Sequence, residues 1–384
     1  MSLPLATSTW SEDEHAAILR AIDSGRLTMG PEVAAFEREF AEWLGAKYAV
    51  MVNSGSTANL LATAALFYRS RDALNAGDTI IVPAVSWSTT YFPLAQYGLK
   101  LKFVDIDPHT LNYDLDQLGD ALDRHTRAIM VVNLLGNPNY LDRLQSYGLP
   151  IIEDNCESMG AVYNGKRAAT YGLVGTHSTF FSHHICTIEG GIVNTDDEEI
   201  YHILLALRAH GWTRDLPKRN HVCIKSDNPF EESFKFVLPG YSVRPTEISG
   251  ALGRTQLKKL DGIVEARRRN ADTFYQWFGD HPHIQMQKEI GESSWFGFSM
   301  VVKPGAPFKR DQLVEALGTH GYDCRPIVAG NFLRNPVIKH IRHTVHGELK
   351  NADYIHDNGL FVGNHHYDIS DQIESLYNIV LSLA

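Results

Sequence analysis

The sequence has 384 residues, enough for two domains of ordinary size. Hydrophobic residues make up 44% and charged residues 21%, a composition typical of a folded globular chain, which argues against long disordered segments. The formal net charge is −10 and no run of lysine and arginine is long enough to follow a phosphate backbone, so nucleic-acid binding is not expected.

Two further features bear on location and metal chemistry. The first residues, MSLPLATSTWSEDEHAAIL, have neither a basic start nor a long apolar core, and no stretch reaches the ~18 apolar residues of a membrane-spanning helix. We therefore expect a cytoplasmic protein without a membrane partner. The cysteines are far apart and form no CxxC pair, so no metal site is expected; they are Cys156, Cys186, Cys223 and Cys324.

Apolar runs alternate with loops and helical patterns through the first two thirds of the chain. The run YAVMV (48–52) is followed by the small-residue turn NSGSTAN and by the Ala/Leu-rich segment LLATAALFYRS, which predicts a strand, a loop and a helix. Further strands are predicted at residues 79–83, 101–106, 128–135 and 150–154. This alternation favours an α/β fold with a mostly parallel sheet covered by helices on both faces.

The pattern changes after about residue 262. The charged segment VEARRRNADTFYQWF leads to the strand pattern FGFSMVV and then to RDQLVEALGTHGYDCRPI, which predicts a smaller C-terminal α+β domain. We place the large domain at residues 1–255 and the small domain at residues 256–384, with a connecting helix near the boundary.

Predicted strand ends carry residues suited to ligand binding, because ligands of open α/β sheets bind at the carboxyl ends of strands. Gly55 permits close backbone approach, and Ser56 and Thr57 add hydroxyls to the free amides that begin a helix. A plain helix cap is the alternative for this loop. Asp154 ends the run PIIED, either as a buried carboxylate that needs a cationic partner or as a cap of the next segment.

Aromatic and imidazole side chains follow two more strand patterns. Trp87 comes after TIIVP and is either a stacking platform or a core residue. The segment FFSHHICTIEGG (Phe180–Gly191) places His183 beside His184, shortly after Ser178. Neighbouring side chains of an extended segment point to opposite faces, so this pair is a poor metal site. His183 is then either a catalytic base or a structural histidine.

In this order the segments resemble fold-type I pyridoxal phosphate enzymes, and among them the aminotransferases that act on nucleotide-linked keto sugars. The similarity extends from PLATSTW to FVGNH and includes SGSTANLL, VSWSTTYFPLAQYG, EDNCESMGA, RAHGWTR and FKFVLPGY. It implies an aspartate-aminotransferase-like fold, pyridoxal 5'-phosphate or pyridoxamine 5'-phosphate as the cofactor, and a homodimer with active sites at the subunit interface.

The resemblance also implies roles for the candidate residues. The cofactor phosphate would be held by Gly55, Ser56, Thr57 and Ser178. Trp87 would stack on the cofactor ring, Asp154 would pair with the ring nitrogen, and Glu157 would lie near the ring hydroxyl. Ser242 departs from the family pattern, which has an asparagine that reaches the phosphate in the partner subunit. Serine keeps a donor but is shorter, so this contact would need a water.

The family carries a lysine six residues before the Glu of its Glu-Gly-Gly motif, and that position is His183 here. No lysine occurs between Lys166 and Lys218, so a shifted alignment cannot restore it. A lysine forms a Schiff base with the cofactor aldehyde and moves protons, whereas an imidazole only moves protons. We therefore expect His183 to act as a base, with the cofactor held by non-covalent contacts.

The histidine-bearing branch of the family implies a deoxygenating dehydratase. Its substrate would be a GDP-linked 4-keto-6-deoxy sugar that loses the C3 hydroxyl, with L-glutamate as the amino donor and ammonia as a product. For the nucleotide sugar, the loop RAHGWTRDLPKRN (Arg208–Asn220) offers His210 and Arg214, and Arg325 can bind a carboxylate or phosphate bidentately. A solvated basic loop and a surface ion pair are the alternatives.

Three other functions stay open. An ordinary aminotransferase would leave the amine on the sugar, but the missing lysine argues against it. An iron–sulfur, pyridoxamine-dependent dehydrase would need clustered cysteines, which this sequence lacks. An inactive relative would bind the cofactor yet show no spectral change with glutamate.

Overall fold

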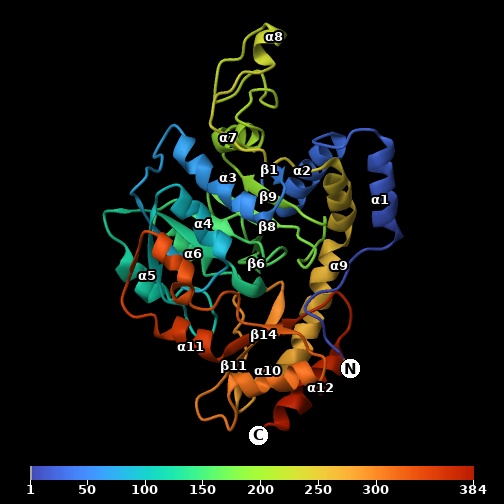
Figure 1. Ribbon diagram of the computed structural model, residues 1–384, viewed down its shortest axis with the longest axis vertical. Coiled ribbons are helices and arrows are strands. Elements are labelled where there is room, and N and C mark those ends of the chain that lie inside the picture. Colours follow the sequence, from blue (N-terminus) through green and yellow to red (C-terminus); the bar gives the residue numbers. More distant parts are fainter. Residues whose placement is uncertain (1) are drawn as a thin grey trace.

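The computed structural model describes residues 2–384, which form two main sheets with flanking helices and a separate two-stranded sheet of β6 (Val162–Tyr163) and β7 (Lys166–Arg167) (Figure 1). The large sheet has eight strands in the order β1-β9-β8-β5-β4-β2-β3-β13. These are β1 (Tyr48–Val52), β2 (Thr79–Pro83), β3 (Lys100–Val104), β4 (Thr126–Val132), β5 (Ile151–Asp154), β8 (Val174–Ser178), β9 (Gly191–Thr195) and β13 (His343–Val345). Neighbouring strands are parallel except at β9, which runs antiparallel to β1 and β8. The mostly parallel sheet predicted from the sequence is confirmed.

Helices cover both faces of this sheet. They are α2 (Pro31–Leu44), α3 (Gly55–Tyr68), α4 (Ser88–Gln96), α5 (Leu115–Ala121), α6 (Leu141–Gln145), α7 (Glu198–Arg208) and α9 (Glu247–Phe278). Outside this layer, α1 (Glu12–Asp23) packs against α9, and α11 (Lys350–Asn358) contacts two strands of the second sheet. Successive side chains of a strand point to opposite faces. In β1, Val50 and Val52 therefore pack with α3 and α7, while Ala49 and Met51 pack with α2 and α9.

The C-terminal part forms a second, antiparallel sheet in the order β10-β11-β14-β12, seen at the bottom of Figure 1. Its elements are β10 (Ile284–Gln285), β11 (Gly297–Val302), α10 (Arg310–Thr319), β12 (Cys324–Arg325), β14 (Gly359–Gly363) and α12 (Ser370–Leu381). Stacked rings of Phe274, Phe278 and Phe298 lie in its core. The smaller α+β unit is thus present. The division at residues 255 and 256 falls inside α9 and stays a prediction, and β13 joins the large sheet beside β3.

The segment between α7 and α9 extends away from the body at the top of Figure 1 and contains α8 (Pro229–Glu232). Ile224 and Phe230 on this segment are 91% and 87% exposed. The remaining elements are short: η1 (Leu134–Gly136), η2 (Phe332–Arg334) and η3 (Pro336–His340). Within residues 2–384, none of the helices has the length and apolar character needed to cross a membrane.

Candidate active site

A cavity of about 360 Å³ lies at the carboxyl edge of the large sheet. Asp154 ends β5, Ser178 ends β8, and Gly55 begins the helix that follows β1. Parallel strands bring their carboxyl ends to one edge, which explains why positions so distant in sequence meet here. The predicted residues that line the cavity are Gly55, Ser56, Trp87, Asp154, Glu157, Ser178 and His183.

The amino terminus of α3 and the end of β8 form a cradle suited to an anion. The Ser54 side chain caps α3 by accepting the Thr57 N–H at 3.1 Å. Gly55 lies so close to Ser178 that a Cβ on this glycine would stand 2.7 Å from Ser178 Cβ. Helix amides and the hydroxyls of Ser56 and Ser178 therefore converge on the cavity, which fits the phosphate group of pyridoxal phosphate.

Asp154 is a buried carboxylate, 5% exposed, with neutral hydrogen-bond donors around it. Its Oδ2 accepts from Thr90 Oγ1 at 2.7 Å and from Asn59 Nδ2 at 2.9 Å, and its Oδ1 accepts from the Cys156 N–H at 3.2 Å. In the described chain it has no ion pair with a lysine, arginine or histidine. A buried anion calls for a cationic partner, and a protonated ring nitrogen in the cavity would supply one.

Trp87 and Glu157 complete the part of the cavity that suits a flat ring. Trp87 is 56% exposed at the start of α4, so it is not a core residue and can offer its face to a ligand. Glu157 accepts the Leu135 N–H at 3.0 Å. Burial, aided by the neighbouring Asp154 charge, raises the pKa of Glu157 to about 7. Near neutral pH this carboxyl can therefore either hold or release a proton.

His183 and His184 have different surroundings, although residues 181–185 form turns and bends and not the extended segment considered from the sequence. His183 lines the cavity. His184 is fully buried, and its Nε2 donates to the Ser294 carbonyl at 3.1 Å. Burial, and secondly the Arg267 charge, lower the pKa of His183 to about 4. Near neutral pH, His183 is thus unprotonated and free to accept a proton, while His184 anchors the segment.

Thr57 and Ser242 do not line the cavity. The Thr57 hydroxyl belongs to the helix cap and donates to Asn53 Oδ1 at 2.7 Å. Ser242 is exposed and its backbone bridges to Ala209, close to the end of α7. The predicted contacts of Thr57 and Ser242 with a cofactor phosphate therefore stay predictions. Ser242 lies on the surface of the chain.

The three predicted substrate-binding residues also lie outside the cavity. The Arg214 guanidinium lies 4.4 Å from the centre of the Trp212 ring, and the His210 ring is packed against the same tryptophan. Arg325 is exposed on β12 and donates to the carbonyl of Cys324. Arg208, at the start of the basic loop, is buried and paired with Glu37, so it has a structural role. Substrate binding by the other three stays a prediction.

Sequence reasoning missed Asn59 and Thr90, the two side chains that hold Asp154. Asn59 also accepts the Thr176 hydroxyl at 2.7 Å, so it connects α3 to β8. The only local signal was weak: Asn59 ends the small-residue turn NSGSTAN, and Thr90 follows Trp87 by three residues.

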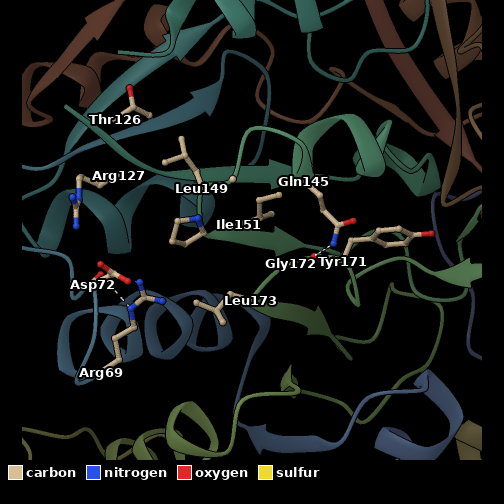
Figure 2. A pocket seen from close by; sticks show the side chains of 12 residues that line it. Arg69, Asp72, Thr126, Arg127, Gln145, Leu149, Ile151, Tyr171, Gly172 and Leu173 are labelled. Carbon is tan, nitrogen blue, oxygen red and sulfur yellow. Dashed lines mark hydrogen bonds between the residues drawn. The ribbon is translucent and has the colours of Figure 1, made fainter. Parts of the chain in front are cut away.

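A larger cavity of about 670 Å³ lies elsewhere and is shown in Figure 2. It is lined by Thr126 and Ile151, the first residues of β4 and β5, together with Arg69, Arg127 and Tyr171. It therefore opens at the amino ends of the strands, away from the edge that carries Asp154 and Ser178. We place the candidate active site in the smaller cavity for this reason.

Comparison with known proteins agrees with this geometry. The model of the DegT/DnrJ/EryC1/StrS aminotransferase family matches residues 8–380. The chain belongs to this family. A family-wide match of this extent, together with the sheet order, confirms the fold expected from the sequence resemblance.

Similar family members share nearly the whole chain. A GDP-4-keto-6-deoxy-D-mannose 3-dehydratase of Yersinia pseudotuberculosis is 58% identical, over 99% of this chain and 98% of the relative. The structure of the Escherichia coli enzyme of that name with bound hydrated pyridoxal phosphate matches with a TM-score of 0.98 at 56% identity, over 99% of each chain. A structure of this dehydratase with a trapped PLP-glutamate geminal diamine has a TM-score of 0.97 at 56% identity, covering 99% of this chain and 100% of the other.

Proposed function

We propose that this protein is a pyridoxamine-phosphate-dependent dehydratase that removes the C3 hydroxyl of GDP-4-keto-6-deoxy-D-mannose. The products are GDP-4-keto-3,6-dideoxy-D-mannose and ammonia, and L-glutamate restores the amine form of the cofactor. For each sugar oxygen removed, one glutamate is oxidised to 2-oxoglutarate, which balances atoms and electrons. The observation that carries this function is His183 in a cavity whose described lining contains no lysine.

Each part of the cavity has a task in this reaction. The amino terminus of α3, with Ser56 and Ser178, binds the phosphate, and Asp154 keeps the ring nitrogen protonated. A bound pyridoxamine phosphate would supply the amine that reacts with the C4 ketone of the sugar and would act as an electron sink for loss of the C3 hydroxyl. His183 is the base of the reaction: it would accept the proton from the amine-bearing carbon of the cofactor, because its imidazole is neutral at neutral pH.

The lack of a lysine in the cavity favours dehydration over ordinary transamination. Without a primary amine in the cavity, nothing from the protein competes for the cofactor aldehyde, so Asp154, Trp87 and the phosphate cradle must retain the cofactor. The amine then leaves as ammonia instead of staying on the sugar. The similarity to 3-dehydratases at 58% and 56% identity supports this choice over an aminotransferase.

The iron–sulfur alternative receives no support from the described residues. The four cysteines are free, and no group of three or more His, Cys, Asp or Glu side chains in residues 2–384 converges as a metal site. We also propose that the protein works in the cytoplasm, where glutamate and nucleotide sugars are available, as a homodimer in which Ser242 faces the partner's cofactor phosphate. The exposed position of Ser242 supports this arrangement.

The product of the reaction tests the function. The protein is incubated with pyridoxal phosphate, L-glutamate and GDP-4-keto-6-deoxy-D-mannose, and the nucleotide sugar is analysed by mass spectrometry. We expect a sugar that has lost one oxygen, with equal amounts of 2-oxoglutarate and ammonia. A sugar with nitrogen in place of its ketone oxygen would indicate an aminotransferase, and a cofactor spectrum unchanged by glutamate would indicate an inactive relative.

A further inference from the structure

Arg267 is a buried cation that the reaction above does not use. It lies on α9, is 5% exposed, and donates through Nη1 to the carbonyls of Phe296 at 2.9 Å and Trp295 at 3.4 Å. Its Nε has no partner, and within the described chain it makes no salt bridge. Burial lowers the pKa of Arg267 to about 10, so it is still charged at neutral pH. Burying a charge without a counterion costs free energy. A role of Arg267 that offsets this cost would explain its retention at this position.

The surroundings of Arg267 connect it to the active site through Phe296. The carbonyl of Phe296 accepts from Arg267, while its ring centre lies 5.2 Å from that of His183 and 5.9 Å from that of His184. The Trp295–Phe296 backbone is also held by Asn364, which donates to the Trp295 carbonyl at 2.9 Å. Arg267 therefore contacts the backbone of Phe296, whose ring packs against His183.

We propose that Arg267 is a positioning residue: it holds the backbone of Phe296, on which the His183 ring packs, and as a buried cation at that place it disfavours a second positive charge on His183. This deepens the proposed function, on which it rests for the task of His183 as a base. Like charges near an imidazole disfavour its protonated form. Burial, and secondly the Arg267 charge, also lower the pKa of His184, His365 and His366.

The other titratable groups near His183 lie in the cavity. Three carboxyl groups and a thiol line the cavity with His183: Asp154, Glu157, Glu189 and Cys156. Carboxylates favour the protonated imidazole, which could not accept a proton. On the protein side the charged and titratable groups are Arg267 and His184. Of these groups, Arg267 is the one whose charge acts on His183, and it disfavours the imidazolium form.

Histidine titration by NMR in the cofactor-free protein tests this role. His183 is assigned as the imidazole signal lost in His183→Asn. In the wild type we expect His183 to stay neutral down to a pH well below 6.5. Two neutral variants, Arg267→Gln and Arg267→Met, should each raise its pKa, while burial keeps that pKa below 6.5. Arg267→Lys keeps the charge and should retain the low value.

The matched control is Arg269→Gln, two positions along the same helix, where the side chain is 63% exposed and paired with Glu265. This change should leave the His183 pKa as it is. One folded neutral variant, Arg267→Gln or Arg267→Met, is enough for the test. If the His183 pKa in that variant equals the wild-type value, the proposed role of Arg267 is wrong. A wild-type midpoint near 6.5 overturns it without any variant. Because no cofactor or substrate is present, a failure of the dehydratase assignment would leave these titrations unaffected and would be recognised separately.

Discussion

The hydroxyl of Thr90 donates to the Asp154 carboxylate at 2.7 Å. Thr90 lies on α4, one turn after Trp87, and Asp154 ends β5. This single bond therefore fixes the exposed aromatic face and the buried carboxylate relative to each other. A planar cofactor needs both at once, one against its ring and the other at its ring nitrogen.

Asp154→Asn should weaken cofactor binding strongly. The amide keeps the size of the side chain and one acceptor oxygen but lacks the charge that a protonated ring nitrogen needs. Loss of one partner of a buried ion pair costs roughly 3 kcal/mol or more, so the dissociation constant should rise by roughly 100-fold. Titration with pyridoxal phosphate, followed by absorbance, measures it. Asp116→Asn, at a side chain that is 98% exposed, is the control and should bind normally.

His183→Asn should keep the cofactor but lose turnover, because asparagine cannot accept a proton. General-base loss typically lowers the rate by about 10²–10⁴-fold. His183→Lys should also stop dehydration, and it should acquire a covalent bond to pyridoxal phosphate that borohydride makes permanent. Intact-protein mass spectrometry detects that bond. Full dehydratase activity in the asparagine variant would remove His183 from the mechanism.

Gly55→Ala should impair the phosphate cradle, since the added Cβ would lie 2.7 Å from Ser178 Cβ and 3.0 Å from Cys156 Sγ. Overpacking of this kind costs about 1–3 kcal/mol, which we expect to appear as weaker cofactor binding. Gly262→Ala is the matched control. A Cβ on Gly262 meets nothing within 4 Å, so alanine there should stabilise α9 slightly. Equal cofactor affinity in both variants would contradict the cradle.

Glu157 should make the cofactor-free protein less stable as the pH rises. Its pKa is raised from 4.5 to about 7 in the folded state, so folding is linked to proton uptake between these values. The free energy of unfolding should fall by on the order of 2–3 kcal/mol through this window and change no further above it. Glu157→Gln should remove this loss. Urea unfolding at pH 5 and pH 8, at one protein concentration, compares the two proteins.

Continuous apolar runs were the part of the fold that the sequence predicted best. β1 and β2 begin and end where predicted because turn residues flank each run. β8 and β9 escaped prediction because they carry polar residues whose partners lie in the sheet, such as His177 and Asn194 at 3.0 Å. β13 is three residues long, and its pairing with β3 bridges more than 200 positions, which no local pattern reveals.

The candidate site also combines residues that a local sequence pattern predicts with residues whose contacts come from distant segments. Gly55 and Asp154 were predictable because each stands at the end of a predicted strand, where the topology of the sheet fixes the ligand site, whereas Ser178 at the end of β8 came only from the family resemblance. The roles of Asn59 and Arg267 depend on contacts between distant segments, and in the sequence each looks like an ordinary helical residue. Contacts of this kind follow from tertiary packing rather than from local pattern.

The fate of the glutamate nitrogen tests the central claim most directly. The protein is supplied with pyridoxal phosphate, GDP-4-keto-6-deoxy-D-mannose and L-glutamate labelled with a heavy nitrogen isotope. A dehydratase whose cavity lacks a lysine should release all of the label as ammonia and leave none in the sugar. Label retained on the sugar at C4 would contradict this account and would make the protein an aminotransferase that works with a histidine in place of its lysine.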